Sequence, residues 1–186
     1  MNIRRTSLLL GSIACLLGSI PAAQAQDLSP DEKSCKQFVQ TFYNWYTTME
    51  KRGVKGDPLT VALKQKKSNF DATLVQQIKE DEAASARNGG EVVGLDFDPV
   101  LNAQDMCDKY TVGKVTKKDA NYLVDVYGHW TGKKESKPDV TPELSKRNGQ
   151  WTFVNFHYGK SDIADNENLI SVLKVLKKDR QKNGIH

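Results

Sequence analysis

The feature that most constrains the fold is a change of hydrophobic period near the middle of the chain. Before Asn88-Gly89-Gly90, apolar residues recur every three or four positions, which is the spacing of amphipathic helices. After it, apolar and polar residues alternate, most clearly over residues 121–127, which is the period of a strand with one buried face. Helices followed by consecutive strands predict an α+β fold, with the helices on one side of an antiparallel sheet.

Three helices are predicted, over residues 34–51, 68–87 and 166–182. Ser68 is a suitable N-cap for the second, and lysines and an arginine near the end of the third suit a helix C-terminus. The first carries an apolar stripe that includes several aromatic residues: Cys35, Phe38, Val39, Phe42, Trp45, Tyr46 and Met49. We interpret this stripe as core packing, with a wall of a ligand pocket as the alternative.

Four strands are predicted, over residues 110–115, 121–130, 141–146 and 150–158. Asn148-Gly149 lies between the last two and is a strong signal for a two-residue β-hairpin turn. The expected fold is therefore a sheet of about four strands, packed against N-terminal helices and followed by a C-terminal helix.

The N-terminus has the pattern of an export signal. Arg4 and Arg5 precede an apolar run over residues 8–20, and Ala23-Gln24-Ala25 matches the small residues at a cleavage site. This predicts a signal peptide of residues 1–25 and a single periplasmic domain of residues 26–186, with no transmembrane segment after cleavage. Residues 12–15 weakly resemble a lipobox, so a lipoprotein tethered through Cys15 is the alternative.

Removal of the signal changes the charge and the cysteine count. The segment holds two arginines and no acid, so its loss lowers the formal charge from +4 to +2, which argues against a nucleic-acid partner. Cys35 and Cys107 then remain as an even pair in an oxidising compartment, which predicts a disulfide between them.

Three segments carry a resemblance to a known family: residues 38–46, residues 94–105 and residues 151–159. They resemble a family of small exported bacterial proteins that contain a domain of unknown function. The resemblance implies a cone-like α+β architecture, similar to NTF2-like or cystatin-like folds, in which helices pack on a curved antiparallel sheet. It implies no reaction, because such folds host both enzymes and binding modules.

Polar residues in the predicted strands form one candidate site. By strand parity Asp125 and His129 share a face, and a group of Asp125, His129 and His157 could line the cavity of the cone, walled by Tyr46 or Trp130. The alternative is that these side chains lie on the solvent face or at the rim of the sheet.

A second polar cluster comprises Asp96, Asp98, Asn102 and Asp105. It does not match a calcium-binding loop, because Leu101 and Cys107 occupy the positions of the required glycine and glutamate. We interpret the cluster as a turn at Asp98-Pro99, with a looser cation site as the alternative. No cysteine or histidine spacing indicates a zinc site, so no metal is predicted.

Catalytic motifs are missing from the sequence: there is no Gly-x-Ser-x-Gly, phosphate-binding glycine loop or His-Glu-x-x-His. We therefore predict no catalytic residues and no cofactor. The favoured hypothesis is an exported binding domain whose partner is another periplasmic or envelope protein. One version is an immunity-type inhibitor of an envelope-acting toxin or hydrolase. The competing hypothesis is a small-ligand carrier or enzyme that uses the cavity of the cone.

Overall fold

The computed structural model describes residues 27–52, 54–87, 93–159 and 168–185. The predicted signal peptide, Cys15 and the Asn88-Gly89-Gly90 segment lie outside these ranges. Within them, no helix combines the length and the apolar character needed to cross a membrane.

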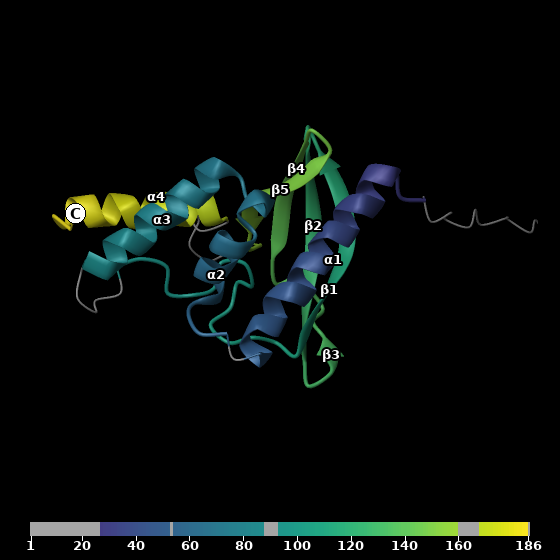
Figure 1. The fold of residues 1–186 in the computed structure, drawn as a ribbon, viewed down its shortest axis with the longest axis horizontal. Helices are drawn as coiled ribbons and strands as arrows, with labels where there is room; N and C mark the ends of the chain where they lie inside the picture. The colour runs from purple at the N-terminus through teal and green to yellow at the C-terminus, as the bar shows by residue number, and fades with distance from the viewer. Residues whose placement is uncertain (1–26, 53, 88–92, 160–167, 186) are drawn as a thin grey trace, which may run out of the picture.

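The fold is α+β, as predicted, and it ends in a C-terminal helix (Figure 1). The helical elements are α1 (Pro30–Lys51), α2 (Pro58–Gln65), the 3-10 helix η1 (Lys67–Asn69), α3 (Ala72–Arg87) and α4 (Leu169–Lys182). The strands are β1 (Lys109–Lys118), β2 (Asn121–Trp130), β3 (Lys133–Lys134), β4 (Thr141–Arg147) and β5 (Gln150–His157). The short helix α2 was not predicted, because the glycines and proline around it indicated a loop.

The strands form one antiparallel sheet in the order β1-β2-β4-β5, and β3 pairs with the end of β2. The predicted turn joins β4 to β5. Asn148 and Gly149 have φ values of 52° and 79°, and positive φ at both central residues is the requirement of a type I′ turn. Arg147 pairs with Gln150 directly beside the turn, so the local sequence sets the register of this hairpin.

Helix α1 crosses one face of the sheet in front of β1 and β2 (Figure 1). Its aromatic stripe packs into the core, where the rings of Phe42 and Phe153 lie 4.7 Å apart and Phe156 stacks on Phe153. Tyr43 and Tyr46 are completely buried beside them. Aromatic side chains therefore fill this face of the sheet, which supports the core interpretation of the stripe.

Helices α3 and α4 lie side by side next to β5 (Figure 1). A buried ion pair joins them, with Arg180 Nη1 donating to Asp81 Oδ1 at 2.5 Å. The same guanidinium nitrogen donates to the carbonyl of Val93, and Asp81 Oδ2 accepts from the amide of Leu95. The pair thus fixes the chain where it leaves α3 and approaches the sheet.

The predicted disulfide is not formed, because Cys35 and Cys107 are both free and buried. Burial raises the pKa of the Cys35 thiol to about 12, with charges on Asp31 and Lys146 close by. Cys107 instead packs against Gly128, where an added Cβ would lie 2.5 Å from its sulfur. Lys146, near Cys35, adjoins the start of β2, whereas Gly128, beside Cys107, lies near the end of β2. These two positions are separated by roughly 20 Å along the strand. A disulfide needs Cα atoms within about 7 Å, so these locations do not suit a bridge.

Candidate functional site

The structure does not bring the predicted cavity residues together. In β2 the buried Val124 and Val126 face the core, so the alternating Asp125 and His129 lie on the opposite face of the sheet. Tyr46 is buried on the α1 side. Trp130, at the end of β2, is 42% exposed.

Polar side chains on the sheet bond to one another. His129 Nε2 lies 2.9 Å from Thr111 Oγ1, and His157 Nε2 lies 2.8 Å from Glu143 Oε2. Burial raises the pKa of Glu143, but hydrogen bonds from His157 and Asn121 outweigh it and leave that pKa below its ordinary value. Glu143 lies in β4 and His157 lies in β5, the two strands that the predicted hairpin joins. Strand parity in these paired strands could therefore have identified Glu143 as a partner of His157. These partners favour a structural role for both histidines.

No metal site is evident either, since no three His, Cys, Asp or Glu side chains in the described ranges gather closely enough to hold an ion. The looser cation site considered for residues 96–105 therefore lacks a compact set of ligands.

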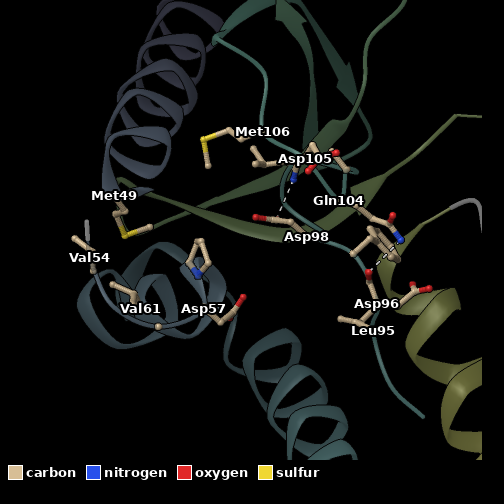
Figure 2. A pocket seen from close by; sticks show the side chains of 15 residues that line it. Met49, Val54, Asp57, Val61, Leu95, Asp96, Asp98, Gln104, Asp105 and Met106 are labelled. Atoms are coloured by element: carbon tan, nitrogen blue, oxygen red, sulfur yellow. Dashed lines mark hydrogen bonds between the residues drawn. The ribbon is translucent and has the colours of Figure 1, made fainter. Parts of the chain in front are cut away.

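The candidate site is a pocket of about 670 Å³ between the end of α1, the start of α2 and the segment over residues 95–106 (Figure 2). We call it the acidic pocket. Its lining comprises Met49, Val54, Gly56, Asp57, Pro58, Val61, Leu95, Asp96, Phe97, Asp98, Leu101, Ala103, Gln104, Asp105 and Met106. None of the five residues predicted for the cavity of the cone belongs to this lining.

Charge is unevenly distributed around this pocket. Four aspartates line it, Asp57, Asp96, Asp98 and Asp105, and none of the other described residues of the lining is a lysine, arginine or histidine. Apolar side chains from α1 and α2, such as Met49 and Val61, lie on the helical side (Figure 2). The combination is a negatively charged pocket with an apolar wall.

Asp98 is held in place by a turn that its own carboxylate organises. Oδ1 accepts hydrogen bonds from the amides of Val100 at 2.8 Å and Leu101 at 3.2 Å. Main-chain bonds between Asp98 and Ala103 close the turn, and Asn102 within it has a positive φ of 54°. This agrees with the turn predicted from Asp98-Pro99, in which an aspartate side chain satisfies nearby backbone N–H groups.

Three tyrosine hydroxyls anchor the same turn to the core. Tyr46 donates to Asp98 Oδ2 at 2.8 Å, Tyr43 donates to the carbonyl of Val100 at 2.7 Å, and Tyr158 donates to the carbonyl of Pro99 at 3.1 Å. Tyr43 and Tyr46 come from α1, whereas Tyr158 directly follows β5. The aromatic core therefore holds the wall of the pocket in a fixed position.

The environment of Asp98 also changes its acidity. Burial raises the pKa of this carboxyl group to about 6, although the hydrogen bonds from Tyr46, Val100 and Leu101 act in the opposite direction. Asp57 adds to the rise through charge repulsion. The charge of the pocket consequently depends on pH in the mildly acidic range.

Asp57 reaches the pocket because it caps α2. Its Oδ2 accepts from the amide of Thr60 at 2.7 Å and from the Thr60 hydroxyl at 2.9 Å, and Pro58 begins the helix. An aspartate followed by proline is a recognisable helix start, so this signal was available in the sequence. Asp57 and Asp98 are about forty positions apart in the chain, and no local sequence pattern indicates that they line the same pocket.

Comparison with known proteins gives no match: no family model, no curated protein and no solved structure matches this chain. The resemblance to a family of exported proteins therefore stays a prediction, and functional inference depends on the geometry of the acidic pocket.

Proposed function

We propose that this chain is an exported binding domain that receives a positively charged group in the acidic pocket. The observation that carries the proposal is a pocket of about 670 Å³, whose described lining holds four aspartates and no basic residue. Its volume is within the range of ligand pockets in proteins. A cation entering it meets carboxylates, and no basic side chain belongs to the described lining.

The apolar wall narrows the class of ligand. Met49, Val61 and Met106 offer aliphatic and thioether contacts beside the carboxylates. Lysine and arginine side chains combine an apolar stem with a charged head, so they match both parts of the lining. A basic side chain of a partner protein is thus the ligand that we favour.

The arrangement of the polar groups supports binding over catalysis. Asp98 is the most enclosed of the four carboxylates, and three hydrogen bonds engage it in the turn. Within the part of the chain that the structure describes, the lining contains no histidine, serine, cysteine or lysine that could act with Asp98 as a base or nucleophile. The aromatic packing beneath α1 likewise favours a binding domain over a carrier that uses the cavity of a cone.

The proposed location is the periplasm and the proposed partner is another periplasmic or envelope protein, of which a secreted or delivered toxin is one version. The N-terminal signal supports export, and the acidic pocket would repel nucleic acid. Mass spectrometry of the protein recovered from cells tests this directly. An N-terminus at Gln26 supports the proposal, and an acylated Cys15 supports the lipoprotein alternative.

Binding is tested by NMR titration with Nα-acetyl-lysine methylamide, using the uncharged norleucine analogue as the control ligand. We expect shifts in the amides of residues 57 and 95–106 with the lysine probe only. The variant Asp96→Asn/Asp105→Asn removes two exposed charges and leaves the Asp98 turn intact. It should weaken binding about fivefold, since each exposed charge contributes roughly 0.5 kcal/mol.

The matched control is Glu135→Gln/Asp179→Asn, which removes two exposed acids outside the pocket. Its affinity for the lysine probe should equal that of the unaltered protein. The proposal fails if the lysine probe shows no saturable shifts, or if the control variant weakens binding as much as the pocket variant does.

A further inference from the structure

A second pocket, of about 690 Å³, lies between the end of α2, η1 and the first half of α3. We call it the lysine groove. It shares α2 with the acidic pocket, since Pro58 and Val61 line that pocket and Lys64 and Gln65 line this one. Its full lining is Lys64, Gln65, Lys67, Ser68, Phe70, Ala72, Val75, Gln76 and Lys79.

The charge of the lysine groove is opposite to that of the acidic pocket. Lys64, Lys67 and Lys79 are all exposed, and no acidic residue is among the described residues of the lining. The nearby carboxylates all have partners, and Glu80 accepts from Gln76 of the lining and from Lys177. Asp71 caps the start of α3 through the amide of Thr73 and lies 3.7 Å from Arg147, and Glu82 accepts from the Thr60 hydroxyl.

The shape and chemistry of the groove favour a peptide segment as its occupant. The three lysines come from α2, η1 and α3, so the positive charges are spread over the groove. Such a distribution suits a ligand with several carboxylates better than one isolated anion. Phe70 and Val75 are the buried apolar members of its lining, and the lysine stems add apolar surface. An extended chain can enter a concave groove between two helices, whereas a flat lipid surface cannot.

We propose that the lysine groove binds an acidic segment of the same partner protein whose basic side chain enters the acidic pocket. This rests on the proposed function, because both sites then form one interface across α2. An eight-residue helix is about 12 Å long, so the partner presents a basic residue and an acidic segment at roughly that separation. Opposite charges at the two ends of α2 fix the orientation of the partner.

The test is an NMR titration of the full domain with a capped acidic hexapeptide of alternating glutamate and leucine. A peptide with glutamine in place of glutamate is the control ligand. We expect saturable shifts at residues 64–79 with the acidic peptide, and weaker binding when NaCl is raised from about 50 to 200 mM. The variant Lys64→Gln/Lys67→Gln/Lys79→Gln should weaken binding about tenfold, at roughly 0.5 kcal/mol for each lysine.

The matched control is Lys174→Gln/Lys178→Gln/Lys182→Gln, which removes three exposed charges from α4. Both variants keep good helix-forming residues, so both should melt as the unaltered protein does. The control should change the affinity less than twofold. Equal weakening by the two variants, or no saturable shift with the acidic peptide, overturns the proposal.

Two further experiments distinguish a membrane surface from a peptide as the occupant of the groove, and a failure of this inference from a failure of the proposed function. Vesicles of anionic phospholipid should not displace the peptide, and displacement that depends on the same three lysines would assign the groove to a membrane surface and overturn the proposal. The acidic peptide should bind Asp96→Asn/Asp105→Asn with undiminished affinity. If the peptide binds but the lysine probe does not, the proposed function is contradicted, and with it the shared interface, while the groove remains a site for an acidic segment. If the lysine probe binds but the peptide does not, only this inference is contradicted.

Discussion

At the scale of single residues, Asp98 connects the stability of the fold with the charge of the acidic pocket. Its carboxylate accepts two backbone amides and the Tyr46 hydroxyl, while burial raises its pKa to about 6. In the unfolded chain an aspartate titrates near 3.9. Between these two values the folded protein binds more protons than the unfolded chain does, so the contribution of Asp98 to stability decreases as pH rises.

The corresponding prediction concerns Asp98→Asn. Because the pKa of Asp98 is about 6 in the folded protein, its contribution to the free energy of unfolding should fall by about 1 kcal/mol from pH 5 to pH 7. The variant has no carboxyl group at this position, so its free energy of unfolding should not show this part of the decrease. Urea unfolding of both proteins at the two pH values measures the difference. Parallel pH profiles of the two proteins would show that Asp98 titrates as it does in the unfolded chain.

The two buried cysteines give a second prediction at this scale. Because neither forms a bridge, protein that is unfolded without reductant should show reactive thiols at both Cys35 and Cys107. In the folded protein both should react slowly, since burial raises the pKa of each thiol. Alkylation followed by mass spectrometry checks this, and a Cys35–Cys107 crosslinked peptide would contradict the structure.

At the scale of elements, the ion pair between α3 and α4 positions one wall of the acidic pocket. Arg180 and Asp81 are buried and together bind the backbone at Val93 and Leu95. Gly94 between them approaches so closely that a Cβ would collide with Ser85 and Asp81. Since Leu95 lines the acidic pocket, the packing of two helices influences a binding site that neither helix lines.

Arg180→Met should therefore have two effects. Removing one partner of a buried pair leaves the other charge uncompensated, so the free energy of unfolding should fall by about 3–5 kcal/mol. Arg180→Met/Asp81→Asn should recover part of this loss, because the buried charge is then absent. Urea titrations of the three proteins provide the comparison, and a loss below about 1 kcal/mol in the single variant would show that the pair is solvated.

At the scale of the whole molecule, α1 and the sheet share an aromatic core, while α3 and α4 extend beside β5. The segment over residues 95–106 joins these parts, since tyrosines from the core hold its turn and Asp81 holds its beginning. Both proposed binding sites border α2, which lies where the two parts meet (Figure 1).

We accordingly predict that the described domain unfolds as one cooperative unit. Far-ultraviolet circular dichroism reports on all helices, and Trp45 and Trp151 fluorescence reports on α1 and the sheet. The two signals should give coincident urea transitions. Limited proteolysis that yields two stable fragments, or transitions with separate midpoints, would contradict this prediction.

Much of the fold was predictable because its signals are local. The period of apolar residues identified three of the four α-helices described and the four longer strands, and Asn148-Gly149 identified the tight hairpin turn. The turn at Asp98-Pro99 was predictable for the same reason, since its hydrogen bonds join near neighbours in the chain. The sequence by itself determined the α+β class, the longer secondary-structure elements and this turn, but not α2, η1 or β3.

Only the tertiary structure decided where distant side chains meet. The acidic pocket brings Asp57 and Asp98 together, the core joins Tyr46 to Asp98, and the two cysteines lie apart although their even number suggested a bridge. Strand parity placed Asp125 and His129 on one face correctly, but it could not show that aromatic residues fill the other face. The physical reason is that periodicity reports which side of an element is buried, whereas a pocket depends on how separate elements pack against one another.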